Sequence, residues 1–333
     1  MRIAVHPARA LARAALAALL CSACGTVAVR VPVMRPAEIN MAPYSSVAIG
    51  GMTGNGDRPM TAAIEESLVG TNRFQVVDRS HMDQVMRELN LSSTDLANPA
   101  SAAKLGKVVT AGALIFGDVN ENYRETPDQQ QSKDDKGNTH TRFEIKGELV
   151  VRATFKVVDV ATGRLLIAKT YEEKRDDTNH GFDKKPSPID RPALERSART
   201  AVRDHFMAAI VPHQDYINAS FMKDGDIPQL EGGIGWAERG DWAKAEATFN
   251  DAATAAEKNP KIDSKKLSKC YWNLGLSYEY AGDYAKANDM VNKAFTLSND
   301  RDMLGELDNI KRLQDDARRL AEQTAAPEAA GGR

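Results

Sequence analysis

The sequence has few cysteines, few aromatic residues and no excess of charge of one sign. Its cysteines are Cys21, Cys24 and Cys270, aromatic residues make up 6% of 333 positions, and the formal net charge is −2. Two of the cysteines lie in the N-terminal leader, so the rest of the chain has no intramolecular disulfide framework. Sparse aromatics disfavour base-stacking platforms, and balanced charge gives no broad basic surface. We therefore expect no nucleic-acid partner.

Motifs of catalysis and of metal binding are also missing. The histidines after the leader stand apart from one another and from cysteine: His81, His140, His180, His205 and His213. The segment 101–104 fits S-x-x-K, but no S-D-N or K-T-G accompanies it, so a polar helical turn is favoured. The glycines at 51, 54 and 56 match no phosphate-loop motif and predict a tight turn. We predict no enzyme activity, no cofactor and no metal site.

The first 24 residues have the features of a lipoprotein signal peptide. Three arginines precede a short apolar segment at 14–20, which is too short to span a bilayer permanently. Ser22 and Ala23 then lead to Cys24, and this resembles a bacterial lipobox, although Cys21 takes the place usually held by leucine. We expect a covalent diacylglycerol and acyl lipid on Cys24. The alternative is an ordinary signal peptide cut near Ala23, with an unmodified thiol.

The residue that follows the lipobox cysteine indicates in which membrane a lipoprotein is retained. Gly25 follows the cysteine where an aspartate would favour inner-membrane retention, so resemblance to sorted lipoproteins implies the outer membrane. Several acyl chains anchor a protein firmly, whereas a single chain binds marginally. We expect a lipid-anchored protein of the outer membrane that faces the periplasm. Prolines at 32, 36 and 43 interrupt regular structure, so residues 25–43 are predicted to be a linker.

Residues 44–215 alternate between strand and helix patterns. Phe74 to Val77 predicts a short strand, helices are predicted after Ser80 and after Asn98-Pro99, and residues 113–119 form an apolar run that suits a covered strand. Residues 145–157 alternate between apolar and charged, which predicts a long strand with one buried face. A turn at 161–163 leads to an antiparallel strand at 164–171, residues 135–138 suggest a hairpin tip, and Pro192 opens a helix to 210. This order predicts an α/β layer.

Two of these segments, 73–88 and 102–119, resemble the CsgG/HfaB family, the curli production assembly and transport lipoproteins of Gram-negative bacteria. The matching positions are Arg73, Phe74, Val77, Arg79, Glu88, Leu105, Gly106, Gly112 and Gly117. The phrase VVDVATGRLL is also typical of the family, and the match runs from about residue 45 to 209. The resemblance implies a layered α/β (α+β) domain with a mixed sheet and flanking helices, and a role in secretion or cell-envelope biogenesis.

Two polar segments of the chain help to distinguish a membrane channel from a scaffold protein. The curli channel is a ring whose subunits each insert two hairpins into the outer membrane. The equivalent segments here, 123–144 and 172–190, are charged and lack an alternating apolar face, which disfavours insertion in lipid. We therefore expect a non-enzymatic assembly or scaffold factor, with self-association left open. Two alternatives are a ring-forming secretion channel subunit and a lipoprotein activator of peptidoglycan synthases.

Residues 228–321 become alanine-rich and carry two aligned segments. The phrase G-D-[WY]-A-K-A begins at Gly240 and again at Gly282, and the surrounding small and aromatic positions match the tetratricopeptide pattern. We predict two helical repeats separated by a linker near 259–261, a capping helix at 302–321 and a disordered tail at 322–333. We expect these repeats to bind protein partners or secreted subunits, and the alternative is that they only extend the core or drive self-association. The candidate partner-binding residues are Trp236, Trp242, Phe249, Tyr271, Trp272, Tyr278 and Tyr284. Cys270 is predicted to be a helix-packing thiol.

Overall fold

The computed structural model describes residues 25–77 and 112–325, with five isolated positions between them (87, 88, 101, 104 and 108). The chain divides into two compact units. One joins the residues up to Pro36 to His213–Ala321, and the other comprises Ala37–Pro212 with the C-terminal residues from Glu322. The predicted signal peptide, the helices predicted after Ser80 and Asn98, and the tail beyond residue 325 lie outside the described residues.

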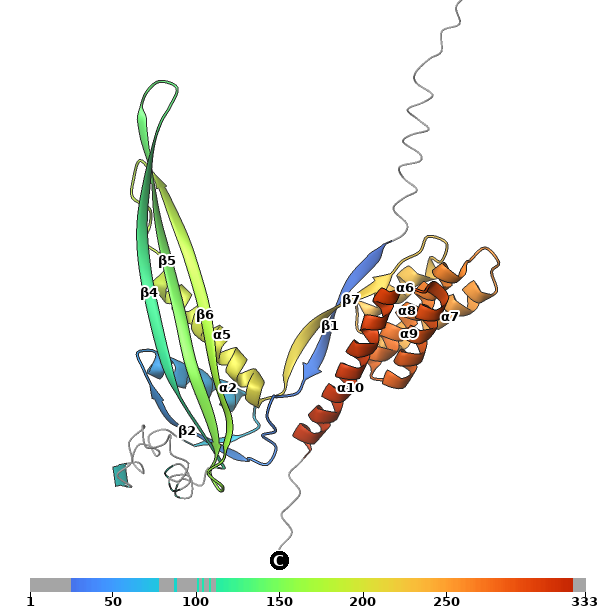
Figure 1. Ribbon diagram of the computed structural model, residues 1–333, viewed down its shortest axis with the longest axis horizontal. Helices are drawn as coiled ribbons and strands as arrows, with labels where there is room; N and C mark the ends of the chain where they lie inside the picture. Colours follow the sequence, from blue (N-terminus) through green and yellow to red (C-terminus); the bar gives the residue numbers. More distant parts are fainter. Residues whose placement is uncertain are drawn as a thin grey trace, which may run out of the picture. The chain divides into compact units, whose positions relative to one another are not determined.

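The second unit is a five-stranded sheet with helices on one face (Figure 1). Its elements are β2 (Ser46–Thr53), α2 (Asp57–Gly70), β3 (Gln75–Val77), β4 (Ala113–Lys133), β5 (Thr139–Asp159), β6 (Leu165–Phe182) and α5 (Arg191–Ile210). The strand order is β3-β2-β4-β5-β6. β2 runs parallel to β3 and β4, whereas β4, β5 and β6 are antiparallel. The sheet is therefore mixed, as expected.

The core of this unit follows from the alternation along β5. Leu149, Val151 and Phe155 point to the same face and are fully buried, as predicted. Helix α5 covers that face, and the rings of Phe155 and Phe206 stack with centroids 4.4 Å apart. The Asp190 carboxylate accepts a hydrogen bond from the backbone N–H of Ala193 and so caps the start of α5.

The glycine-rich segment between β2 and α2 is a tight turn, as predicted. Gly54 has φ +94°, and a Cβ there would lie 2.1 Å from the carbonyl oxygen of Val119. The N–H of Gly56 donates to the same oxygen at 3.1 Å. Only glycine allows the turn to approach β4 so closely. The glycines are therefore explained by packing within the sheet unit.

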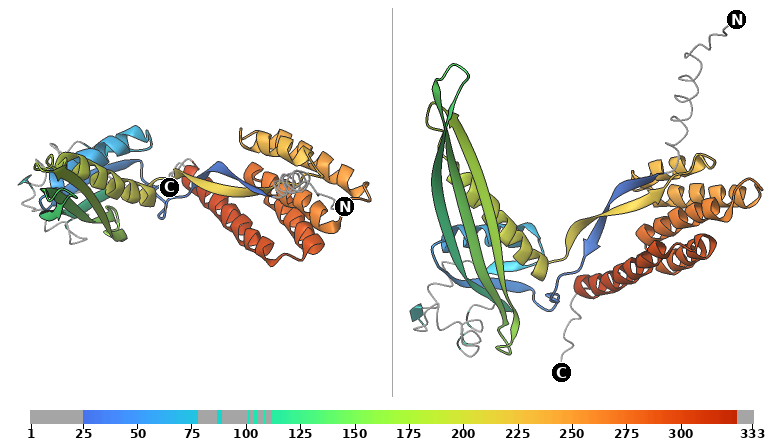
Figure 2. Two further views of the ribbon diagram at one scale, coloured as in Figure 1. Left: turned by 90° about the horizontal axis from the view of Figure 1, so that it is seen from above. Right: turned by 45° about the horizontal axis from the view of Figure 1, so that its top comes forward.

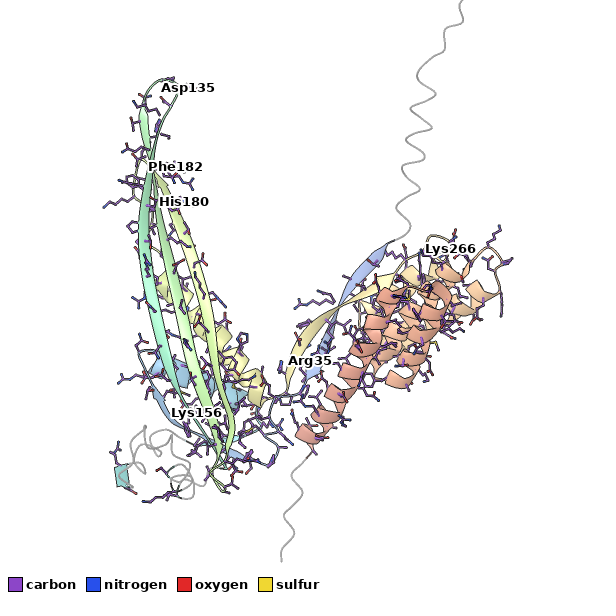
Figure 3. The ribbon with its side chains drawn as sticks, viewed as in Figure 1. Arg35, Asp135, Lys156, His180, Phe182 and Lys266 are labelled. Atoms are coloured by element: carbon purple, nitrogen blue, oxygen red, sulfur yellow. The ribbon has the colours of Figure 1, made fainter. Side chains whose placement is uncertain are left out.

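The strands extend further than the sequence analysis predicted. β4 continues to Lys133 and β6 to Phe182, through polar segments in which no strand was expected. Each gains a full ladder of backbone pairs with β5, and charges on neighbouring strands meet, as Lys174 and Glu148 do at 3.3 Å. Backbone hydrogen bonds and cross-strand charge pairs can together stabilise a strand that has no apolar face. The predicted hairpin tip is confirmed, and Asp135 lies there (Figure 3).

The first unit combines a two-stranded ribbon with helices. Its elements are β1 (Thr26–Arg35), β7 (His213–Met222), α6 (Gln229–Ala237), α7 (Trp242–Glu257), α8 (Ser264–Ala281), α9 (Tyr284–Ser298), the 3₁₀ turn η2 (Arg301–Met303) and α10 (Leu304–Thr324). Helices α6 to α9 pack in sequence order, each against the next (Figure 2). They form the two predicted repeats, and α10 occupies the position of the predicted capping helix. It continues to Thr324, so the first three residues of the tail predicted to be disordered are helical.

The recurring G-D-[WY]-A-K-A phrase encodes the turn inside each repeat. Gly282, with φ +90°, is the left-handed C-cap of α8, and Gly240, with φ +71°, closes the turn that follows α6. Asp241 and Asp283 then cap the next helix, each accepting from the backbone N–H three residues later at 3.2 Å. The sequence repeat therefore specifies where two helices end and two others begin.

Close helix approach inside each repeat also depends on glycine. A Cβ on Gly233 would lie 2.3 Å from the Phe249 ring, and one on Gly275 would lie 2.8 Å from the Val291 side chain. These contacts occupy matching places in the two repeats. Val291, where the sequence pattern expects an aromatic residue, thus fills the same gap with less volume.

Gly233 and Gly235 offer a matched pair on one helix. We expect Gly233→Ala to lower the free energy of unfolding by about 1–3 kcal/mol, because the added methyl displaces the Phe249 ring. No atom lies within 4 Å of a Cβ at Gly235, so Gly235→Ala should raise stability by about 0.5–1 kcal/mol through helix propensity. Urea unfolding followed by tryptophan fluorescence measures both. Equal effects at the two sites would contradict this packing.

The segment predicted as a linker is partly a strand. Residues 26–35 form β1, which pairs antiparallel with β7, from Thr26 opposite Met222 to Arg35 opposite His213. Val29 and Val31 are buried against the helices, and Pro32 lies on the exposed side of the ribbon. Proline is tolerated because a two-stranded ribbon leaves one edge of each strand unpaired. The N-terminal segment thus belongs to the repeat unit instead of trailing before the sheet.

Candidate functional site

The ribbon is fixed to α8 by side chains that complete its backbone hydrogen bonds. The Trp272 indole N–H donates to the carbonyl of Ser220 at 2.8 Å. The Asn273 amide donates to the carbonyl of Met222 at 2.8 Å and accepts from its N–H at 2.7 Å. Asn273 is fully buried, so both contacts are shielded from water. The ribbon and the repeats consequently share one core.

Hydrogen bonds to the repeat unit begin at Gly25, the residue after the predicted lipid-attachment cysteine. The carbonyl of Gly25 accepts a hydrogen bond from the N–H of Lys223 at 2.8 Å. Asp224 follows, 4% exposed, and pairs with the Lys269 ammonium of α8 at 2.7 Å. Cys24 itself lies outside the described residues. The chain is thus attached to the repeat unit from residue 25 onward.

The predicted partner-binding aromatics fall into two groups. Phe249 is fully buried, and Tyr271 and Trp272 are each 6% exposed, so these three contribute to the core. The other four, which are partly exposed, are Trp236, Trp242, Tyr278 and Tyr284. A tetratricopeptide pattern marks all seven alike, because aromatic positions that fill the core and positions at the surface recur with the same period. Only the second group is available to a partner.

The exposed aromatics form a repeated surface feature. Lys244 lies over the Trp236 ring, with Nζ 4.4 Å from its centroid, and Lys286 lies over Tyr278 at 5.1 Å. Each lysine also pairs with the aspartate that caps its helix, at 2.7 and 2.6 Å. Each repeat thus presents an aromatic ring, an ammonium and a carboxylate together. Such a combination can hold polar and apolar parts of a polypeptide at once.

The family comparisons agree with this architecture. Residues 38–183 match the model for the curli production assembly/transport component CsgG, and residues 237–300 match a tetratricopeptide repeat model. The chain contains a CsgG domain followed by tetratricopeptide repeats. The predicted family and fold class are confirmed. No curated protein matches the chain.

Solved structures resemble parts of the chain. The C-terminal domain of LpoB from Salmonella enterica is 14% identical, over 39% of this chain and 83% of that one, with a TM-score of 0.25. Lipoprotein GNA1162 from Neisseria meningitidis is 14% identical, over 49% and 97%, with a TM-score of 0.29. Rare lipoprotein B from Shewanella oneidensis is 13% identical, over 49% and 86%, with a TM-score of 0.20.

The sheet unit contains a shielded ion pair between β4 and α5. The Nε and Nη2 groups of Arg199 each donate a hydrogen bond to one oxygen of the Glu121 carboxylate, at 2.5 and 2.6 Å. The Glu121 side chain is 7% exposed, and the hydrogen bonds to it raise the pKa of Arg199. A bidentate pair of this kind fixes orientation. It holds the helix on the strand and offers no open group for chemistry.

Two further titratable side chains have pKa values shifted by their surroundings. His140 is exposed near the hairpin tip, where hydrogen bonding to Asp183 and Asp134 raises its pKa. Burial raises the pKa of the Cys270 thiol to about 12, which suits the predicted packing role. Within residues 25–77 and 112–325, no three histidine, cysteine or acidic side chains gather as a metal site. In the same part of the chain, no helix is long and apolar enough to cross a membrane.

Glu279 on α8 makes the repeat unit sensitive to pH. Burial, together with the charge of Glu306, raises its pKa from 4.5 to about 9. Between these values the folded chain keeps a proton that the unfolded chain releases, so raising the pH favours unfolding. We expect Glu279→Gln to remove a slope of up to about 1.4 kcal/mol per pH unit between pH 5 and 8. Denaturant titrations at several pH values test this, and an unchanged slope would contradict it.

Proposed function

We propose that this protein is an outer-membrane lipoprotein that faces the periplasm and acts as a non-enzymatic scaffold in secretion or envelope assembly. The pairing of a CsgG domain with tetratricopeptide repeats supports an assembly role, since the first match is named for curli production, assembly and transport. The repeats would recruit a protein partner or a secreted subunit, as helical repeats do along their surfaces.

The observation that carries the proposal is the attachment of the N-terminus to the repeat unit. β1 begins at Thr26, two residues after Cys24, and its apolar side shares a core with the helices. A lipid on Cys24 would therefore hold the repeats themselves close to the membrane surface, with almost no slack. A partner bound by the repeats would be concentrated at the same surface.

The exposed aromatic and lysine pairs are the part of the repeats that we assign to recruitment. Trp236 with Lys244 and Tyr278 with Lys286 stand at matching places in the two repeats. A partner segment that bridged both would gain from two weak contacts at once. The buried aromatic residues Phe249 and Trp272 belong to the core of the same unit.

Membrane fractionation of the tagged full chain tests the anchor. Wild type and Cys21→Ala should sediment with the outer membrane, whereas Cys24→Ala should appear in the soluble periplasmic fraction because it lacks the acylated thiol. Mass spectrometry of the mature N-terminus would show the acyl chains directly. Outer-membrane retention of Cys24→Ala would overturn the lipid assignment.

Co-purification tests the scaffold role. Proteins cross-linked to the wild type in intact cells should be lost with Trp236→Ala/Tyr278→Ala and kept with the control Asn292→Ala, a surface change on α9. Partners that persist in the double variant would contradict recruitment by the repeats. Conductance in planar bilayers would indicate a channel subunit instead, and stimulation of a purified glycan polymerase would indicate a synthase activator.

A further inference from the structure

A cavity of about 190 Å³ lies within the repeat unit, bounded by β1, α8, α9 and α10. Its apolar wall includes Pro32 and Val33 of β1 and Leu313 and Leu320 of α10. Its other lining residues include Glu279 and the rings of Tyr280 and Tyr284. An aliphatic wall together with aromatic rings and one carboxyl suits a ligand with an apolar stem and a charged head.

Glu279 lacks the contacts that a buried carboxyl normally has. It is 1% exposed, and among the described residues no N–H or hydroxyl group donates a hydrogen bond to either of its oxygens. The polar group that it meets is the Glu306 carboxyl, with which protonated Glu279 shares a hydrogen bond. A buried carboxyl without a cationic partner costs about 1–3 kcal/mol, which is unusual for a residue with only a packing role. The two carboxyl groups therefore lack a cation between them.

The charges around Glu279 favour a positive ligand. Glu306 and Asp316 of α10 are negative, whereas Arg312 of α10 and Arg35 of β1 are positive. Both arginines already have partners. Arg35 pairs with Asp316 at 2.7 Å and with Asp215 at 3.6 Å, and Arg312 donates to Asn309 at 2.8 Å. Two arginines thus lie near three carboxyl groups, those of Glu279, Glu306 and Asp316. Neither arginine forms an ion pair with Glu279.

We propose that this cavity receives the side chain of a lysine or arginine from a partner polypeptide, with the charged head on Glu279 and the methylene stem along the apolar wall. The identity of the ligand as a partner's side chain rests on the proposed function, but the site itself does not. The rings of Tyr280 and Tyr284 add cation–π attraction to the head.

Binding of such a cation is coupled to proton release. Glu279 is protonated at neutral pH, since its pKa is about 9, and it must ionise to pair with the incoming charge. One proton leaves the carboxyl for solvent as one cation binds. The affinity for a permanently charged cation should therefore rise about tenfold per pH unit between pH 6 and 8.

Calorimetric titration of the full chain with N-butylguanidinium tests the site without any partner or membrane. We expect saturable binding, release of one proton per site in buffers of different ionisation enthalpy, and no binding of the neutral analogue N-butylurea. Glu279→Gln should abolish binding. Glu246→Gln is the matched control, because Glu246 on α7 is also a partly buried carboxyl with a raised pKa but lies outside the cavity.

A measurement on the wild type keeps the test independent of how the variant folds. At pH 7 the carboxyl carbon of Glu279, followed by NMR, should move from the protonated to the ionised position as N-butylguanidinium is added. A resonance that stays protonated, a flat pH profile or equal binding by Glu279→Gln would each overturn the proposal. Loss of partner capture with intact guanidinium binding would instead count against the proposed function alone.

Discussion

Replacing Asn273 with leucine is expected to lower the free energy of unfolding of the repeat unit by about 2–4 kcal/mol. The leucine has the same number and branching of heavy atoms but leaves both the N–H and the carbonyl of Met222 without the partner that now lies at 2.7 and 2.8 Å. All three tryptophans, at 236, 242 and 272, belong to this unit, so their fluorescence during urea unfolding reports on it alone.

The control for this substitution is Asn292→Leu on α9, where the side chain bonds only within its own helix, to Asn288. Its effect should stay within about 0.5 kcal/mol. A second readout is local. Hydrogen exchange in β1 and β7 should speed up in Asn273→Leu and not in the control. Unchanged exchange in the ribbon would show that Asn273 does not couple it to the repeats.

Arg199→Met should destabilise the sheet unit by about 3–5 kcal/mol, because it leaves the Glu121 carboxylate shielded from water and unpaired. The double variant Glu121→Gln/Arg199→Met should recover much of that loss, since the charge is then gone. Far-UV circular dichroism during urea unfolding measures the effect, and the tryptophan transition of the other unit should not move.

Arg203→Met is the comparison on the same helix, because Arg203 pairs only with its exposed neighbour Asp204. A change of at most about 0.5 kcal/mol is expected there. If both arginine variants cost the same, general loss of helix charge would explain the result better than the bidentate pair. If the double variant were no better than Arg199→Met, the cost would reflect packing of the arginine stem.

Most of the sheet core could be predicted from the sequence because its signal is local. The alternation of Leu149, Val151 and Phe155 specifies one buried face without reference to any other strand. The outer halves of β4 and β6 could not be predicted in this way. Their residues are polar on both faces, and it is the pairing with β5 that makes them strands.

β1 was missed for a related reason. Its partner β7 lies far along the chain. Valines alternate at 27, 29, 31 and 33, but Pro32 among them and the prolines at 36 and 43 predicted a linker instead. A signal was present in β7, where Ile217, Ala219 and Phe221 alternate with polar residues. The sequence repeat also shows that the aromatic residues recur at matching positions. It does not show that Phe249 is buried and Trp236 partly exposed, because that depends on which neighbouring helix covers each residue.

The ribbon also determines the order in which the chain can fold. All strands and helices of the sheet come from Ala37–Pro212, so the sheet can form as soon as this segment has emerged. β1 is synthesised before it, yet its partner β7 is synthesised after it. Residues 26–35 must therefore stay unpaired until the whole sheet unit and the first strand of the next segment have been synthesised. Until then, the apolar side of β1 that later packs against the repeats stays exposed.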